Sequence, residues 1–298
     1  MLKYLVTNSQ DLLWGITVTT VGTHQIRKEY DVYPPRAGHP DKYYFNPREG
    51  RVLDEFQLVY ITKGEGKFYT SKNKCVDVKE GDIMFIMPGL WHCYYPSTKT
   101  GWHEYWIGFK GDIMNRRAQN GFFNNENRIY KVGMRDEIVN LYQQAITVAT
   151  MESTAYQQVL AGIANLLLGF GMAFDKEQQF ENFTVLQMTK AKMIIRENLY
   201  SKITPEEIAN TLNMSYSWFR KTFKEFTGLS PASYMQNLKL KAAKDTLIST
   251  NQSVKEIAYN LQYDNSEHFS TQFKKHVGLS PKDYRMLHGK FAIDKLMD

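Results

Sequence analysis

Basic and hydroxyl side chains recur at helical spacing between residues 216 and 226, where they could contact nucleic acid. The side chains that share one helical face are Ser217, Arg220, Lys221 and Lys224. The opposite face carries Phe219, Phe223 and Phe226, whose i, i+4, i+7 spacing predicts a buried stripe. Such a helix suits DNA, because arginine can hydrogen-bond guanine bidentately and lysine can neutralise phosphate.

The same pattern occurs a second time in the chain. Residues 203–234 and 253–284 match at twelve positions with one inserted residue, and both contain Gly-Leu-Ser-Pro. Each copy predicts a short helix, a turn of about three residues and a longer helix, which is a helix-turn-helix. A helix from about Pro231 to Ile248 would join the copies. Its length of roughly 27 Å is close to the roughly 34 Å between successive major grooves on one face of B-DNA.

The charge of the chain is concentrated in this duplicated half. The 298 residues have a formal net charge of +6. Residues 183–298 contain 17 Lys and Arg against 11 Asp and Glu, whereas residues 1–182 contain 20 of each kind. Basic residues can also solvate helix surfaces, so an all-helical protein-interaction module is the alternative. The duplication and the placement of the basic residues on the longer helices favour double-stranded DNA as the partner.

This half closely resembles the DNA-binding domain of the AraC/XylS family of bacterial transcription regulators. The matching residues are Ile208-Ala209, Phe223-Lys224, Gly228 to Pro231, Leu238 to Ala243, Ile257-Ala258, Phe269, Phe273 to Lys275 and Gly278 to Arg285. The resemblance implies base contacts from Ser217, Arg220 and Lys221 in the first copy and from Ser266, Glu267 and Thr271 in the second. It implies phosphate contacts from Lys224, Lys274 and Lys275. The chain departs from the family at Asn213 and Gln262, where glycine is usual, and at Lys239, where arginine is common.

A second group of residues could bind a small ligand. In residues 102–109, strand alternation places Trp102, Glu104, Trp106 and Gly108 on one face and His103, Tyr105, Ile107 and Phe109 on the other. A carboxylate beside two indole rings suits a ligand with a sugar-like ring and hydroxyl groups. The alternative is an aromatic core in which Glu104 pairs with an arginine.

The first half resembles the effector-binding cupin domain of the sugar-responsive branch of the same family. The residues that carry this resemblance are Tyr60 to Gly66, Gly81-Asp82, Pro88-Gly89, His92 and Gly101 to Phe109. It implies that Tyr94, Glu104 and Trp106 contact the ligand, and that Arg36 in the N-terminal arm does the same. We expect His92 to be structural or to contact the ligand rather than a metal.

The expected elements give a two-domain α+β protein. Short strands between about Asp11 and Lys110 predict a cupin-like β-barrel, in which Lys63 to Gly66 would be a hairpin turn. Two amphipathic helices follow, over about 134–172. We predict a ligand-binding domain over residues 1–173, a polar linker over 174–184, and a DNA-binding domain over 185–298. The last domain is all-α, with two helix-turn-helix units joined by a long helix.

The preferred function is a sequence-specific transcription regulator that responds to a small ligand, predicted to be a sugar. The alternative is a cupin enzyme, a sugar isomerase or oxygenase, fused to a DNA-binding module. We expect no enzyme, no cofactor and no metal, because the chain lacks the paired His and upstream Glu of a cupin metal site and any nucleophile–base constellation. The resemblance implies a homodimer paired through residues of about 134–172, with RNA polymerase as a further partner.

The remaining features suggest a cytoplasmic protein without membrane contact. Cys75 and Cys93 are expected to be reduced thiols. The N-terminal residues show no secretory pattern. The longest apolar region, Ala161 to Phe174, is shorter than the about 20 residues that a membrane-spanning helix needs.

Overall fold

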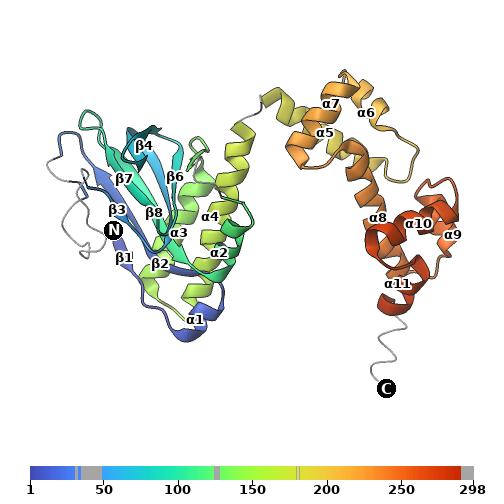
Figure 1. Cartoon of the computed structure of the whole chain (residues 1–298), viewed down its shortest axis with the longest axis horizontal. Helices are drawn as coiled ribbons and strands as arrows, with labels where there is room; N and C mark the ends of the chain where they lie inside the picture. The colour runs from blue at the N-terminus through green and yellow to red at the C-terminus, as the bar shows by residue number, and fades with distance from the viewer. Residues whose placement is uncertain (31–32, 35–48, 124–127, 179, 181, 290–298) are drawn as a thin grey trace. The chain divides into compact units, whose positions relative to one another are not determined.

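The computed structural model describes residues 1–30, 33–34, 49–123, 128–178, 180 and 182–289. The chain divides into two compact units, Met1–Phe180 and Glu181–Asp298. The first combines an antiparallel sheet with helices and the second is helical (Figure 1), so the predicted two-domain α+β fold is confirmed. The boundary between the units falls within residues 174–184, where we predicted the linker.

The first unit is built on strands that pair only antiparallel. Their order is β1-β2-β8-β4-β6-β9, with β5 and β7 pairing β4 and β3 pairing β7. The strands are β1 (Leu2–Tyr4), β2 (Thr17–Ile26), β3 (Arg51–Val52), β4 (Phe56–Ser71), β5 (Lys74–Lys79), β6 (Asp82–Ile86), β7 (Trp91–Pro96), β8 (Trp102–Lys110) and β9 (Ile129–Lys131). Two short helices, α1 (Ser9–Leu13) and α2 (Asp112–Gln119), lie between strands in the sequence.

The longest strand, β4, corrects one expectation. Lys63 to Gly66 is not a hairpin turn but lies within this 16-residue strand. The strand pairs β8 and β6 through its first half and β5 and β7 through its second. A register shift between Ile61 and Lys63 and a positive φ of 86° at Gly64 mark the change. A Cβ at Gly64 would collide with the backbone of Gly101, so glycine allows the strand to bend closely against its neighbour.

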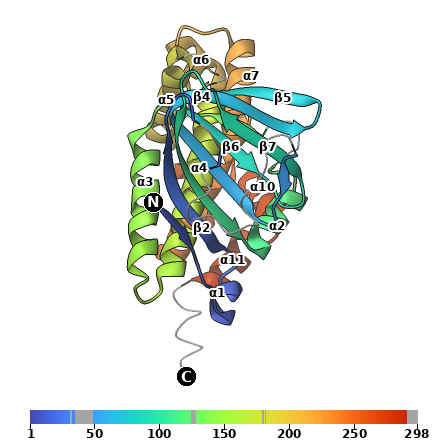
Figure 2. The same cartoon turned by 90° about the vertical axis from the view of Figure 1, so that its left-hand side faces the viewer.

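The sheet has an apolar cluster on each of its faces. Trp102 and Trp106 of β8 belong to one cluster with Phe68 and Tyr94, which is the barrel interior. Tyr105, Ile107 and Phe109 belong to the other cluster, together with the helices. The alternation predicted for residues 102–109 is therefore confirmed. Helices α3 (Asp136–Met151) and α4 (Tyr156–Gln178) cover the outer face of the sheet (Figure 2).

The polar segment expected to be a linker is mostly helical. Helix α4 continues to Gln178, and α5 (Asn182–Glu197) begins four residues later. The segment contains only the end of α4 and the start of α5, and each piece is too short to show a helical period in the sequence.

Helix α4 is also longer than its apolar stretch suggested. With 23 residues, it is long and apolar enough, by length and composition, to cross a bilayer. In this fold, however, it is docked on the sheet. The Gln157 side chain accepts a hydrogen bond from Val18 N and donates one to Val18 O, both at 3.0 Å. This buried side chain therefore ties α4 to the backbone of β2.

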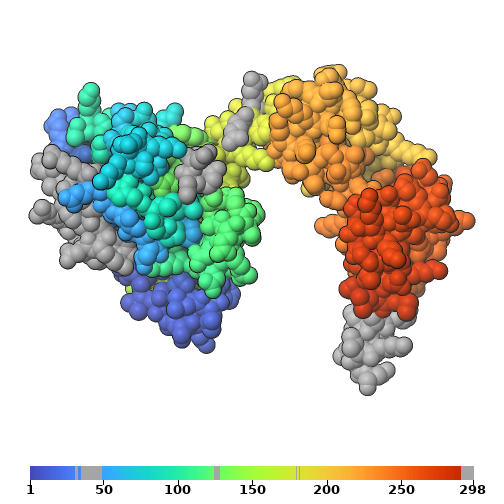
Figure 3. Space-filling view, viewed as in Figure 1, coloured from blue at the N-terminus to red at the C-terminus, as the bar shows by residue number. Residues whose placement is uncertain are grey.

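The second unit contains the two predicted helix-turn-helix units. The helices after α5 are α6 (Pro205–Thr211), α7 (Tyr216–Thr227), α8 (Pro231–Ser249), α9 (Val254–Asn260), α10 (Ser266–Val277) and α11 (Pro281–His288). Phe219 and Phe223 are fully buried in one cluster, and Phe269 and Phe273 in another. Figure 3 shows the two as distinct lobes, one orange and one red. Helix α8 contributes to both clusters and so joins the lobes.

Each helix-turn-helix unit begins with a capped helix. Thr204 and Glu207 form a capping box at α6, and Ser253 and Glu256 form the same box at α9. The two turns contain Asn213 (φ 56°) and Gln262 (φ 58°), both in the left-handed region. Glutamine adopts this region at a cost of about 1 kcal/mol or more relative to glycine, and asparagine at less.

Gln262→Gly is therefore expected to raise the free energy of unfolding by up to about 1 kcal/mol, which shifts the midpoint by a few degrees. Gln272→Gly, the same change inside α10, should lower it by about 1 kcal/mol. Thermal unfolding followed by circular dichroism measures both. A Gln262→Gly protein that is no more stable than the wild type would contradict the assignment of strain to this turn.

Candidate ligand site and nucleic-acid interface

The barrel interior brings together four of the five predicted ligand residues. His92 and Tyr94 lie on β7, and Glu104 and Trp106 on β8, and all four side chains are buried. Arg36, the fifth, lies outside the described residues. Trp106 pairs in register with Gly22 of β2, where a Cβ would collide with the indole ring. The missing side chain of Gly22 therefore makes room for Trp106.

Glu104 is a carboxylate enclosed by aromatic residues. It is 4% exposed, and its Oε2 accepts a hydrogen bond from Tyr33 Oη at 3.0 Å. Its Oε1 lies 3.9 Å from His24 Nδ1. Burial raises the pKa of Glu104 from 4.5 to about 7, against the opposing effects of Tyr33, Arg51 and Trp102. The neighbours of Glu104 therefore offset only part of the cost of burying its charged carboxylate.

Arg51 was not among the predicted residues, yet it organises the site. Its Nε donates to His92 Nε2 at 3.1 Å, and its Nη2 donates to Tyr94 Oη at 2.9 Å. The guanidinium carbon lies 5.6 Å from the centroid of the Tyr94 ring. The positive charge of Arg51 also lowers the pKa of the Glu104 carboxyl.

His92 is held as a neutral hydrogen-bonding residue. Burial and the neighbouring charge of Arg51 lower its pKa to about 3. Its Nδ1 lies 3.1 Å from the carbonyl oxygen of Leu90, which can only accept, so Nδ1 carries the proton. Nε2 is then free to accept from Arg51, as observed. Both ring nitrogens serve the hydrogen-bond network.

Tyr33 is the other residue that sequence reasoning missed. Its side chain is 3% exposed and lies against Tyr94 and Trp102, with ring centroids 6.0 and 5.8 Å away. No sequence pattern around Tyr33 predicts that its side chain lies in the barrel interior. Arg51 is equally hidden, because it lies in a two-residue strand that is aligned with His92 only by long-range pairing.

A second buried carboxylate lies in the bend that directly precedes β4. Glu55 is 1% exposed, and Thr19 Oγ1 and Gln57 Nε2 donate to it. Gly108 of β8 packs directly against Glu55, where a Cβ would lie 2.6 Å from Oε1. The site around Glu104 thus combines one carboxyl, the guanidinium of Arg51 and aromatic faces, which suits a ligand with several hydroxyl groups.

The predicted DNA contacts of the first copy share one exposed face of α7. Ser217, Arg220, Lys221 and Lys224 are all exposed, opposite the buried Phe219 and Phe223. Together with Gly228 to Ser230 and Ser233 they line a hollow of about 620 Å³. Gly228 ends α7 with a φ of 81°, and Ser230 caps α8 by accepting from Ser233 N. The chain therefore turns sharply beside the basic face.

The corresponding face of α10 is less basic near its start. Glu267 and Thr271 are exposed and Ser266 is half-buried. The residue equivalent to Arg220 is Ser270. Lys274 and Lys275 are exposed in the last turn, where they are followed by His276. The first copy thus has cations in the middle of its helix, at Arg220 and Lys221, as well as in the last turn, whereas the second copy has them only in the last turn.

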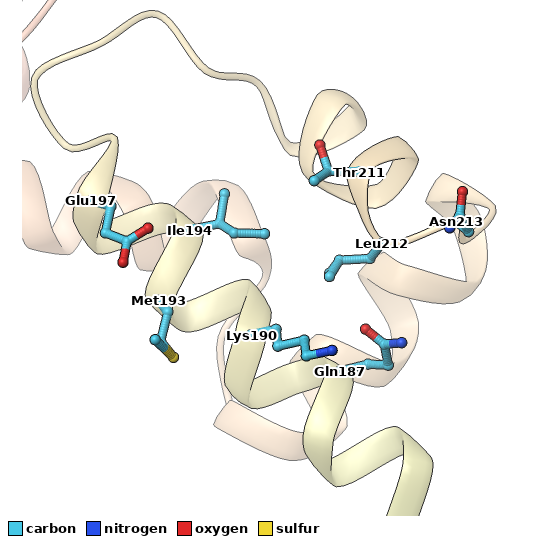
Figure 4. Close-up of a pocket in the computed structure, with 8 residues that line it drawn as sticks. All are labelled: Gln187, Lys190, Met193, Ile194, Glu197, Thr211, Leu212 and Asn213. Carbon is cyan, nitrogen blue, oxygen red and sulfur yellow. The ribbon is translucent and has the colours of Figure 1, made fainter.

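A separate hollow of about 390 Å³ lies on another side of the first lobe. Its lining side chains come from α5 and from the end of α6 with the following turn, and include Lys190, Met193 and Leu212 (Figure 4). None of the predicted DNA contacts belongs to it.

Within the part of the chain that the structure describes, no group of three or more His, Cys, Asp and Glu side chains could hold a metal ion.

Comparison with known proteins gives two family matches. Residues 29–163 match the family described as "AraC-like ligand binding domain", and residues 208–286 match "Helix-turn-helix domain". The "MmsAB operon regulatory protein" of Pseudomonas aeruginosa is 25% identical over 86% of this chain and 83% of its own length. The "Raffinose operon transcriptional regulatory protein RafR" of Pediococcus pentosaceus is 27% identical over 78% and 86%. The "Lactose operon transcription activator" of Staphylococcus xylosus is 25% identical over 78% and 85%.

The fold, the duplicated units and these matches define a DNA-binding transcription regulator with a ligand-binding domain. The chain belongs to the AraC family, with an AraC-type helix-turn-helix domain behind an AraC-like cupin domain. The predicted family is therefore confirmed, and so is the predicted class of function, a DNA-binding transcription regulator with a ligand-binding domain.

The raised pKa of Glu104 predicts a pH dependence of stability. Between about pH 4.5 and 7 the folded state retains a proton that the unfolded chain releases. The wild type should therefore lose about 1–3 kcal/mol of stability as the pH rises through this window. Glu104→Gln should not show this loss, and its amide oxygen still accepts from Tyr33.

Denaturant unfolding at pH 5 and pH 8 gives the free energy of unfolding of the wild type and of Glu104→Gln. The difference between the two proteins should change from one pH to the other. Glu80→Gln, at an exposed glutamate, serves as the matched control. A difference between wild type and Glu104→Gln that is equal at both pH values would contradict the assigned pKa.

Proposed function

We propose that the barrel binds a sugar, and that the bound sugar changes how the helix-turn-helix units engage DNA. The main observation in favour of a sugar is that the buried Glu104 lies on the same strand face as Trp106 and close enough to Arg51 for its charge to lower the Glu104 pKa. A sugar offers hydroxyl donors to the carboxylate, acceptors to the guanidinium and C–H faces to the rings. Two of the three relatives described above take their names from sugar operons, which supports the proposal.

In this proposal the chain is a regulator and not an enzyme. His92, the residue that resembles a cupin metal ligand, uses Nδ1 on Leu90 and Nε2 on Arg51. It acts as a structural element of the ligand site. The protein would work in the bacterial cytoplasm, where it meets DNA and, at the promoter, RNA polymerase.

A homodimer is part of the proposal. Val159 and Leu166 on α4 are about half exposed, at 50% and 49%, and Gly162 and Gly169 lie exposed on the same helical face. A second copy could cover this narrow apolar stripe. Light scattering that gives a monomer at micromolar concentration, with and without ligand, would contradict the dimer.

For DNA, we propose that Ser217, Arg220 and Lys221 contact bases and that Lys224, Lys274 and Lys275 contact phosphates. Ser266, Glu267 and Thr271 would provide the weaker base contacts of the second copy. The exposed basic face of α7 supports this division, because a guanidinium can recognise guanine whereas lysine mainly supplies charge.

Arg220→Ala should weaken binding to a site selected in vitro by about 1–3 kcal/mol and change binding to random DNA far less. Lys224→Ala should weaken both to a similar degree and reduce the salt dependence by about one unit of slope. Fluorescence anisotropy over a salt series measures these effects. Equal losses on selected and random DNA for Arg220→Ala would contradict base contact.

For the ligand, calorimetric titration of the full chain with pentoses, hexoses, lactose and raffinose should identify a sugar that binds. Arg51→Met should weaken that sugar at least about tenfold, or about 1.4 kcal/mol, because a charge-assisted hydrogen bond is lost. Arg27→Met, at an exposed arginine near the end of β2, should leave the affinity unchanged. Absence of binding across the panel, or full affinity in Arg51→Met, would contradict the site.

A further inference from the structure

A path of contacts connects the two DNA-facing helices through a short part of α8. At one end, Phe223 of α7 packs edge-on against Tyr234 of α8, with ring centroids 5.4 Å apart. Two residues further along α8, Gln236 Nε2 donates to Tyr263 Oη at 3.0 Å. Tyr263 lies in the turn between α9 and α10. The second lobe therefore contacts the N-terminal part of α8, which follows directly after the first lobe in the sequence.

Tyr263 continues this path to the second DNA-facing helix. Its ring meets His268 at 5.8 Å and Phe269 at 5.1 Å, both edge-on, and both residues belong to the first turns of α10. Lys239 Nζ of α8 lies 5.6 Å from the centroid of the same ring. One side chain thus contacts α8 through its hydroxyl group and its ring and contacts α10 through its ring.

The surroundings of this contact are partly closed to water. Burial raises the pKa of Tyr263, with Gln236 opposing the rise. Burial also lowers the pKa of Lys239, with Asp264 opposing the fall. A hydrogen bond in such surroundings is stronger than one in water, so it can hold two elements in a defined geometry.

The first lobe has no equivalent of this side chain. Tyr263 N donates to Ala258 O, and Met214 N donates to Ala209 O in the same way, which makes the two residues structural counterparts. Met214 packs as a partly buried apolar residue in the first cluster. The tyrosine is therefore not required by the helix-turn-helix itself, since the first copy folds with a methionine at this place.

We propose that Tyr263 is a positioning residue that sets the separation and rotation of α10 relative to α7, and through them the spacing of the two DNA half-sites. The proposal rests on α7 and α10 being the DNA-contacting helices. One inserted base pair moves a half-site by about 3.4 Å and rotates it by about 34°. A lobe held by Gln236, Lys239 and Tyr263 cannot follow that change without breaking these contacts.

The proposal also accounts for the difference between the two DNA-facing surfaces. The second carries Ser270 where the first has Arg220, and its cations lie in the last turn of α10. Phosphate contacts carry little base information but depend strongly on where the helix is placed. A fixed placement would let the second lobe contribute to selectivity through spacing.

The test uses Tyr263→Phe, which keeps the ring contacts with Phe269 and removes only the hydroxyl. Binding of the full chain is measured on a site selected with the wild type and on versions with one base pair added or removed between the half-sites. The wild type should prefer the selected spacing at least about tenfold, and Tyr263→Phe should reduce this ratio at least about threefold. Tyr259→Phe, at a 77% exposed tyrosine of α9, should keep the wild-type ratio.

A second variant keeps the proposal testable if the first is unstable. Gln236→Leu removes the other partner of the hydrogen bond and should reduce the spacing ratio to a similar degree, with no further reduction in the double variant. Equal affinity loss on all spacings, an unchanged ratio in both variants, or a wild type that tolerates every spacing would overturn the proposal. Arg220→Ala is measured in the same series. If it loses specific affinity, the proposed DNA contacts of α7 hold even where the proposal for Tyr263 fails.

Discussion

The helices that we propose to contact DNA must be exposed on one side and firmly anchored on the other, and the second unit meets this constraint. Phe219 and Phe223 anchor α7, and Phe269 and Phe273 anchor α10, each pair fully buried in its own cluster. Because each lobe has its own core, the lobes can keep their shape independently. Helix α8 then has to determine their separation, and it contributes residues to both clusters. The basic faces stay exposed as a result.

The barrel meets the opposite requirement, since it must hold charge away from water. Isolated buried charges are costly, so they need partners with good geometry. Arg51 is held by His92 and Tyr94, and Glu104 is held by Tyr33 and lies near His24. Glu104 has a raised pKa, which shows that its environment still favours the neutral form. A ligand that brings hydroxyl donors to this carboxylate would lower that cost, and binding energy obtained in this way can shift the balance between two states of a regulator.

Local features of the fold could be predicted from the sequence. The caps at Thr204 and Ser253, the aromatic stripes of α7 and α10 and the alternation of β8 all arise from neighbours within a few residues. The features that escaped prediction depend on distant parts of the chain. The bend of β4 at Gly64 is set by Gly101, and the place of Arg51 is set by pairing with β7. Tyr33 enters the barrel from a segment without periodic pattern. Polar composition concealed the end of α4 and the start of α5, because exposed helical turns and linkers have similar composition.

The central claim is that a single chain places two helices in successive major grooves on one face of DNA. Protection of guanine N7 from methylation, mapped at base resolution with the full chain on a selected site, tests this most directly. The account predicts two protected tracts for each bound chain, with centres about 10–10.5 base pairs apart and the stronger protection under α7. One tract for each chain, or two tracts on opposite faces of the duplex, would contradict it.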